Sequence, residues 1–407
     1  MRRLIPALLL LAVLPGYAGD QPDEFDLDDF RPAPFALGGS VKGLLLGYDL
    51  SDVSLGLLDR EGSLATSLRV TLTGDPTDRI AYELHFEVRD ELVTDPAVAA
   101  LGSATEARNP LFRGLGDGST WVDGNRHTLA ADVAYANLQW SNGRTDVVLG
   151  RQAVTFGRSF FWNPIDWLST FSPTEIDREY KTGVDALRVT RSLGRFSGVE
   201  LVYAYGEGGD RDNSATLARA FGNLNGWDLE LLAGSVWIDD RFGFAFSGDV
   251  LGAGLRGEVS RNAPRSGTDP DFTSATLEVD YRWENSLYLT VELHHNGFGS
   301  KDPDDYAALF LSPRVLTGQA QNVGRDYLAS SLAYEFTPLI NGTVAVLLNL
   351  HDRSGILSPT LDVSLGDNAR LAAGAILPWG DGPTLTGLPT EYGAYPLSAW
   401  VQYRYYF

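Results

Sequence analysis

The residues from Leu397 to Phe407 alternate strictly between two kinds of side chain. One set of alternate positions is apolar or aromatic: Ala399, Val401, Tyr403, Tyr405 and Phe407. The positions between them are more polar: Ser398, Trp400, Gln402, Arg404 and Tyr406. A β-strand places successive side chains on opposite faces, so this period of two predicts a strand with one apolar face. A membrane-crossing barrel strand has this pattern, and an edge strand of a soluble sandwich is the alternative for this segment alone.

Ionisable residues recur at alternate positions of several other predicted strands. In residues 79–90, for example, Glu83, His85 and Glu87 alternate with Tyr82, Leu84, Phe86 and Val88. A charged side chain facing lipid at the bilayer midplane costs about 2–4 kcal/mol for Arg or Lys, so we expect these rows to face a wet interior. The predicted lumen-wall residues are Arg69, Glu83, His85, Glu87, Arg256, Glu258, Glu278, Asp280, Arg282, Glu292, His294 and Arg404.

Residues 1–18 predict a secretory signal peptide. Arg2 and Arg3 precede an apolar run from Leu4 to Leu14, and Ala18 is a small residue at the expected cleavage site. The apolar run is too short for a helical anchor across a bilayer about 30 Å thick. Residues 19–37 are rich in Asp and Glu and predict a solvated, acidic periplasmic arm.

The composition of the chain narrows the fold class further. The formal net charge is −21, which disfavours nucleic acid as a partner because phosphate binding requires a basic surface. There is no cysteine, and 17 tyrosines and 9 tryptophans suit the two membrane interfaces. No segment of the mature chain reaches the roughly 20 apolar residues of a membrane helix. Since backbone groups in lipid must pair within the protein, residues 38–407 predict an all-β, transmembrane, antiparallel up-and-down barrel.

The alternating segments predict eighteen strands, or sixteen if one hairpin is misplaced. They lie near 38–48, 62–73, 79–90, 127–140, 145–156, 183–193, 197–206, 215–224, 228–238, 241–249, 252–261, 272–283, 286–297, 326–337, 341–351, 358–366, 369–378 and 396–407. Short turns join even strands to odd ones, whereas the long connections at 91–126, 157–182, 298–325 and 379–395 join odd strands to even ones. A barrel of this size encloses more space than side chains fill, which predicts a channel.

The connection 157–182 mixes five bulky aromatic residues with charged ones. We expect the aromatic side chains to pack on the inner wall of the barrel and the charged groups to face the pore. The segment is then a constriction loop; a plug or an outward lid without a role in selectivity is the alternative. The predicted pore and constriction residues are Arg151, Asp166, Glu175, Asp177, Arg178, Glu179, Lys181 and Arg188.

Other kinds of site have weaker support. Asp302, Asp304 and Asp305 lie in a long loop, but their spacing is not that of a calcium loop and a solvated loop is expected. We predict no metal site, no cofactor and no catalytic residue, because no hydrolase, zinc or phosphate-binding motif is present. A hydrolase is the alternative, and it would have to use the dispersed residues Ser358, His351 and Asp362, which form no recognised motif.

The leader, the closing run from Tyr403 to Phe407 and the eighteen-strand rhythm resemble a Gram-negative outer-membrane, porin-like protein. A second resemblance, to a segment recurrent in poorly characterised proteobacterial porin-like proteins, rests on Gly150 to Gln152, Phe156, Gly157, Asn163, Pro164, Asp166 and Gly183 to Arg188. At the level of the fold, eighteen strands are also similar to substrate-specific porins and to the alginate exporter. The resemblance implies an outer-membrane location with both termini periplasmic, contact with lipid and lipopolysaccharide, and insertion by the barrel assembly machinery. The oligomeric state stays open.

These observations predict an outer-membrane channel for passive diffusion of small hydrophilic solutes. A modest preference for cations is expected if the acidic excess reaches the pore. The alternative is a structural or assembly barrel, such as the sheath of an export complex, whose lumen is occluded.

Overall fold

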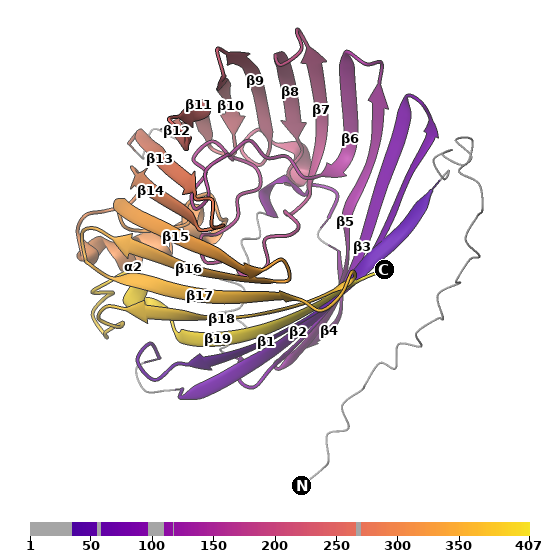
Figure 1. Cartoon of the computed structure of the whole chain (residues 1–407). Coiled ribbons are helices and arrows are strands. Elements are labelled where there is room, and N and C mark those ends of the chain that lie inside the picture. The colour runs from indigo at the N-terminus through magenta and orange to yellow at the C-terminus, as the bar shows by residue number, and fades with distance from the viewer. Residues whose placement is uncertain (1–34, 55–57, 97–109, 117, 266–269) are drawn as a thin grey trace. The chain divides into compact units, whose positions relative to one another are not determined.

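The computed structural model describes residues 35–54, 58–96, 110–116, 118–265 and 270–407. The predicted signal peptide and residues 19–34 of the acidic arm lie outside these ranges. Within them, antiparallel strands form one sheet that curls into a ring (Figure 1). The strands are β1 Ala36–Asp49, β2 Arg60–Thr77, β3 Ile80–Val93, β4 Ser119–Gly124, β5 His127–Ser141, β6 Thr145–Gln152, β7 Val184–Ser192, β8 Gly198–Ala204, β9 Ala215–Leu224, β10 Trp227–Val236, β11 Asp239–Val250, β12 Ala253–Pro264, β13 Phe272–Arg282, β14 Tyr288–Asn296, β15 Asp326–Thr337, β16 Ile340–Asn349, β17 Gly355–Ser364, β18 Ala369–Trp379 and β19 Leu397–Tyr406.

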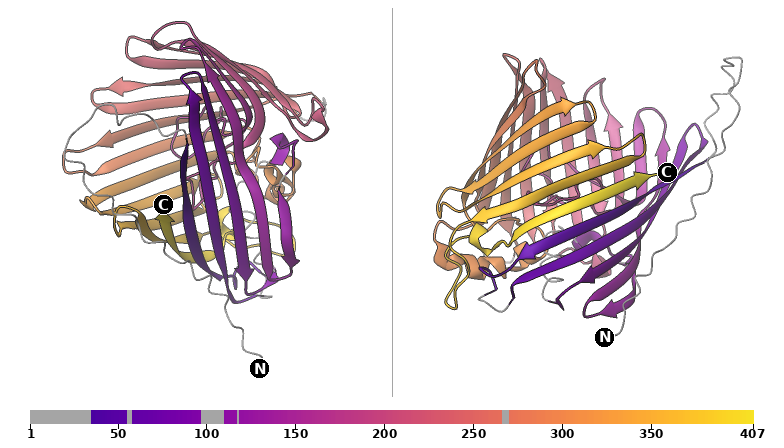
Figure 2. Two further views of the ribbon diagram at one scale, coloured as in Figure 1. Left: turned by 90° about the vertical axis from the view of Figure 1, so that its right-hand side faces the viewer. Right: turned by 60° about the horizontal axis from the view of Figure 1, so that its bottom comes forward.

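Eighteen of these strands form a closed barrel, which confirms the predicted count over the alternative of sixteen. Apart from β3 and β4, strands that are neighbours in sequence pair with each other; β3 and β4 both pair with β5, and β19 pairs with β1. Figure 2 shows the strands running obliquely around the ring, with β19 in yellow beside β1 in indigo. This connectivity is the predicted up-and-down order, and closure leaves the ring without a free sheet edge.

A closed up-and-down barrel requires its first and last strands to pair, and β1 pairs with β19 in antiparallel register. Val41 lies opposite Tyr405, and the amide and carbonyl groups of Gly39 and Phe407 exchange two hydrogen bonds of 2.9 and 3.0 Å. A Cβ atom on Gly39 would lie 2.6 Å from the Phe407 ring and 2.3 Å from the Arg69 carbonyl oxygen. Only glycine therefore fits at this point of the closing pair.

The long connections contain more regular structure than the sequence indicates. Strand β4, within the predicted loop 91–126, pairs with the first residues of β5, so that Ser119 lies opposite Ala131. It is short and exposed along its length, and it therefore has no apolar alternation to reveal it. The short helices are η2 Pro110–Phe112, η3 Glu207–Gly209, η4 Pro303–Asp305, α2 Tyr306–Phe310, α3 Pro313–Leu316 and η5 Tyr392–Ala394. No helix in the described ranges is long and apolar enough to span a membrane.

The strands bury their polar face and expose their apolar face. On β13, Leu277 and Val279 are 47% and 44% exposed, whereas Glu278 between them is 1% exposed. Exposed aromatic side chains gather where short turns join the strands, at Trp140, Phe196, Trp283 and Phe336, and Phe407 lies at the same end. This is the arrangement of a lipid-facing band bordered by interfacial aromatic residues.

Candidate functional site

The segment 153–183, which joins β6 to β7, runs through the interior of the barrel (Figure 1). Its residues contact β12 to β14 on one side and β1 and β19 on another, and these contacts require a path through the ring. We call this segment the inner loop. It begins where the predicted strand 145–156 ends early, at Gln152.

An ion pair clamps the two ends of the inner loop. Arg151 on β6 lies opposite Asp185 on β7, and its Nε donates to Asp185 Oδ1 at 2.7 Å. The same guanidinium donates to the Gly116 carbonyl at 2.7 Å and to Asp132 Oδ1 at 3.4 Å. Arg151 and Asp185 are both buried. Arg151, predicted from the sequence as a pore residue, thus holds the loop's base.

Three glutamates of the wall accept hydrogen bonds from consecutive backbone amides of the inner loop. Glu258 on β12 accepts from the Arg158 and Ser159 amides at 2.6 and 3.1 Å. Glu278 on β13 accepts from the Phe160 amide at 2.5 Å. Glu292 on β14 accepts from the Phe161 and Trp162 amides, both at 2.9 Å. Each carboxyl group offers two acceptor oxygens, so these three side chains hold the backbone of the inner loop against the wall.

The apolar residues of the inner loop pack on the wall in two separate places. Val154, Phe156, Ile165, Trp167 and Leu168 pack with small and aliphatic residues of β7 to β11. Phe161 and Trp162 pack instead with residues of β15 to β18 and with Tyr392. We expected the aromatic side chains of the loop to pack on the inner wall of the barrel. Phe161, Trp162 and Trp167 are buried there, whereas Phe160 is 45% exposed.

A row of alternating charges crosses the inner wall from β7 to β10 and continues into the inner loop. Arg188 donates to Glu200 at 2.8 Å, and Arg219 donates to Glu200 at 3.2 Å and to Glu230 at 2.8 Å. Arg158 of the loop then donates to Glu230 at 2.6 Å. The side chains of Arg188 and Arg219 are 30% and 14% exposed, while those of Glu200 and Glu230 are 1% exposed. The row therefore presents arginine to the lumen.

Only Arg188 of this row was among the predicted site residues. Glu200, Arg219 and Glu230 lie on the polar face of their strands, and the alternation that selected Glu278 would have selected them. Arg158 lies in the inner loop, where no periodicity indicates which way a side chain points.

The predicted loop residues Asp166 and Lys181 form an ion pair inside the inner loop. Lys181 Nζ contacts Asp166 Oδ2, and Thr155 Oγ1 donates to the same oxygen at 2.9 Å. The Asp166 side chain is fully buried, and burial raises its pKa above the ordinary value although Lys181 opposes the shift. Arg178 donates to the Ser172 and Pro173 carbonyls at 2.9 and 2.6 Å.

Glu175 has a similar local role, because it accepts from the Ser172 amide at 3.1 Å. Contacts within the loop thus use four of the predicted constriction residues. They are Asp166, Glu175, Arg178 and Lys181.

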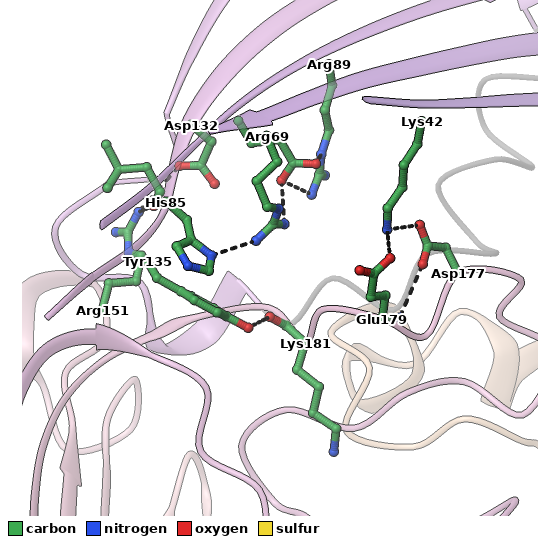
Figure 3. Close-up of polar contacts among 12 residues, drawn as sticks. Lys42, Arg69, His85, Arg89, Asp132, Tyr135, Arg151, Asp177, Glu179 and Lys181 are labelled. Atoms are coloured by element: carbon green, nitrogen blue, oxygen red, sulfur yellow. Dashed lines mark hydrogen bonds and ion pairs between the residues drawn. The ribbon is translucent and has the colours of Figure 1, made fainter. Parts of the chain in front are cut away.

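The remaining predicted acidic groups of the loop meet the closing strands. Lys42 Nζ on β1 lies 2.6 Å from Asp177 Oδ2 and 2.7 Å from Glu179 Oε2 (Figure 3). Tyr406 on β19 donates to Glu179 at 3.0 Å. Asp177 and Glu179 are 31% and 25% exposed, compared with 10% for Lys42. This part of the lumen therefore presents acid, in contrast to the arginine row.

The wall beside this contact carries the predicted residues of β2 and β3. Arg69 donates to Glu87 at 2.8 Å and lies over the ring of Tyr180 of the inner loop, 4.0 Å from its centroid. His85 Nε2 lies 3.0 Å from Glu83 Oε1. Figure 3 shows Arg69 and His85 directed toward the loop residues.

The other predicted wall residues lie elsewhere on the barrel. Arg256 contacts both Glu278 and Asp280, and Arg404 Nε donates to Gln402 at 2.6 Å. Arg282 is exposed at a short turn, where its guanidinium lies 4.9 Å from the Tyr288 ring centroid. His294 stacks on Trp162 of the inner loop, with ring centroids 4.9 Å apart.

A second connection, 297–325, is tied into the barrel by a buried carboxylate. Glu391 accepts hydrogen bonds from Asn322 at 2.8 Å, Tyr327 at 2.5 Å and Asn349 at 2.9 Å. Burial raises the pKa of Glu391. Within the described ranges, no group of three or more His, Cys, Asp or Glu is arranged to hold a metal ion.

Neither protein-family models nor curated protein sequences give a match to this chain. Solved structures do. A BenF-like porin from Pseudomonas fluorescens matches with a TM-score of 0.60, at 10% identity over 92% of this chain and 98% of that one. The chain has the fold of an outer-membrane porin. OccAB3 of Acinetobacter baumannii gives a TM-score of 0.59 at 10% identity, covering 92% and 99% of the two chains.

OccD3 of Pseudomonas aeruginosa extends the comparison, with a TM-score of 0.55 at 11% identity, over 92% of this chain and 91% of that one. Because so few residues are shared, these matches establish the porin fold and do not identify a solute. In a porin fold, the exposed apolar band described above faces lipid.

Proposed function

We propose that this protein is an outer-membrane channel through which small hydrophilic solutes diffuse passively. The main support is the inner loop, which is fastened by polar contacts to separate sectors of the wall inside an eighteen-stranded barrel. Both groups of fastening contacts leave charged side chains partly exposed, the arginine row on β7 to β10 and the acids Asp177 and Glu179 near β1. Charged groups that line a constriction select among solutes by sign and orient polar ones.

The predicted preference for cations depends on which of these two charged sectors dominates. Asp177, Glu179 and Glu83 favour cations, since each is more exposed than its basic partner. Arg188 and Arg219 act in the opposite direction. We propose a modest cation preference arising from the acidic sector, in keeping with the strongly acidic composition.

The proposed orientation places both termini of the barrel in the periplasm. Strand β1 begins, and β19 ends, at the end of the barrel that carries the short turns, and in outer-membrane barrels short turns face the periplasm. Outer-membrane lipid and lipopolysaccharide are the proposed surroundings, and the barrel assembly machinery is the proposed partner during insertion. Single barrels and oligomers are both compatible with this proposal.

A structural barrel with an occluded lumen is the second candidate. It is favoured by the extent to which the inner loop and connection 297–325 are buried, including Phe161, Trp162 and Tyr306. Such a barrel would serve as a sheath or assembly component and would not conduct.

Liposome swelling separates the two candidates. Proteoliposomes containing the folded protein are diluted into isotonic solutions of uncharged solutes of increasing size. The channel predicts swelling rates that fall as solute size increases. Protein that resists unfolding in gels until it is heated, yet gives no swelling with any solute, would instead support the occluded barrel.

A further inference from the structure

A pocket inside the barrel lies where the inner loop, the connection 297–325 and the wall meet. The wall contributes residues of β11 to β14, the inner loop contributes Trp162 to Thr170, and the third side is formed by residues 318–322. We call this the amide pocket, because amide side chains from all three sides line it. They are Asn163, Asn262, Asn296, Gln319, Gln321 and Asn322.

Aromatic rings complete the lining of the amide pocket. The Trp162 indole is held in place by its stack on His294 and by donation from its Nε1 to Asn322 Oδ1 at 2.8 Å. Phe272 and Phe298 form a pair whose ring centroids are 5.8 Å apart. Trp162 is buried between His294 and Tyr327, so the half-buried Phe272 and Phe298 rings are the ones that can offer a ligand apolar contact beside the amide groups.

The charged groups of this pocket are already paired. Arg241 donates to Asp239 at 3.1 Å and to Gln319 at 2.7 Å, and Asp166 contacts Lys181. A charged ligand would lose its hydration in this pocket, and the paired side chains could not compensate with a free opposite charge. Binding of a charged ligand is therefore unfavourable. The lining thus differs from the arginine row and from the acidic sector, and it favours an uncharged ligand.

Three buried polar atoms of the pocket have no hydrogen-bond partner among the described residues: Asn163 Oδ1, Arg241 Nε and His294 Nδ1. Unpaired buried polar atoms are uncommon, because each costs about 1–3 kcal/mol. They include an acceptor, a donor and an imidazole nitrogen that can serve in either role. A hydroxyl group both donates and accepts, so a ligand with several hydroxyls matches a lining that offers both donors and acceptors.

We infer that the amide pocket binds a neutral, polyhydroxylated solute such as a monosaccharide. A pyranose has an apolar C–H face that can lie against an aromatic ring and a rim of hydroxyls that can meet amides. This inference names the solute class for the proposed channel and rests on that function, because a binding site in the lumen acts on solutes that pass through it.

The test compares three sugars that share a skeleton and differ in charge: glucose, the cation glucosamine and the anion glucuronate. Binding to the full-length protein in detergent is followed by tryptophan fluorescence and by calorimetry. The inference predicts that glucose binds at least about tenfold more tightly than either charged analogue. Glucuronate or glucosamine binding as tightly as glucose would overturn the assignment of a neutral ligand.

Two pocket variants and one matched control locate the site. Asn262→Leu removes an amide from the wall of the pocket, and Gln319→Ala removes one from the connection 297–325 while leaving the strands unchanged. Each should weaken glucose binding about threefold or more, since each removes hydrogen-bonding groups. Asn137→Leu removes a buried amide from the inner wall at β5, outside the pocket, and should leave glucose affinity unchanged.

If Asn262→Leu fails to insert, Gln319→Ala still decides the outcome. Glucose binding that neither pocket variant weakens would overturn the inference.

Failure of this inference can be told apart from failure of the channel. Ion current in planar bilayers without any binding or current reduction by glucose contradicts the amide pocket and leaves the channel intact. Glucose binding to a folded barrel that never conducts contradicts the channel and supports the pocket.

Discussion

Lys42 Nζ lies 2.6 Å from Asp177 Oδ2 and thereby joins the first strand of the barrel to the inner loop, 135 positions later in the chain. The same ammonium group also contacts Glu179. One cation therefore holds two carboxylates that would otherwise repel each other. This contact fixes the part of the loop that presents acid to the lumen.

Replacing this lysine should free the second half of the inner loop. In Lys42→Met, Asp177 and Glu179 lose their shared counter-ion, so we expect larger fluctuations of the open-channel current and a shift of the reversal potential toward cations. The change in folding stability should be small, about 1 kcal/mol or less, because both carboxylates are partly exposed and screened. Lys301→Met, at an exposed loop position, is the control and should behave as the wild type.

The same contact predicts a dependence on pH. Burial acts to raise the pKa of Asp177, but the Lys42 ammonium outweighs it and the net pKa is lowered. A carboxyl whose folded-state pKa is lowered stabilises the folded state above its ordinary pKa of about 3.9, and this contribution is lost as the pH falls through the folded value. Current fluctuations should therefore stay constant from pH 7 to about pH 4 and increase below it.

The Asp177→Asn variant tests whether this group carries the effect. It should show large fluctuations already at pH 7, with little further change on acidification. Fluctuations in Asp177→Asn that still rise below pH 4 by as much as in the wild type would assign the titration to another group.

The wall glutamates should control the first half of the loop. Glu292→Ala removes the acceptor of the Phe161 and Trp162 amides, leaving two buried donors unpaired at a cost of about 1–3 kcal/mol each. We expect the loop to detach locally, so that trypsin cleaves after Arg158 or Arg178 in folded protein. Glu284→Ala, at an exposed turn, should remain resistant. Equal resistance of both variants would show that the apolar contacts alone hold the loop.

The barrel itself was largely predictable from the sequence, and the contacts inside it were not. Alternation identifies a strand and its polar face, which is why Glu278 and Glu292 were assigned to the interior. Alternation does not show that their carboxyl groups bind backbone amides of a distant loop, because almost every residue has a backbone amide and the sequence does not indicate which ones are bound. The partners of Arg151 and Lys42 depend on strand register, which alternation fixes only to within steps of two residues, and on the path of the inner loop, which has no periodicity.

Barrel closure can be tested at one glycine. In Gly39→Ala the new methyl group would meet the Phe407 ring and the Arg69 carbonyl, so we expect a loss of about 1–3 kcal/mol in stability from overpacking. Gly43→Ala on the same strand is the matched control, since a Cβ there has no neighbour within 4 Å. The temperature at which each protein unfolds in detergent gels measures the difference. Equal unfolding temperatures for the two variants would show that the closing pair has room for a methyl group at position 39.

Single-channel conductance of the full-length protein in planar bilayers tests the central claim most directly, namely that the barrel is an open pore narrowed by the inner loop. We predict discrete, ion-conducting steps for the wild type and larger steps for Glu292→Ala, in which the loop is released. A protein that is folded and inserted but passes no current, in the wild type and in the released variant alike, would contradict the account.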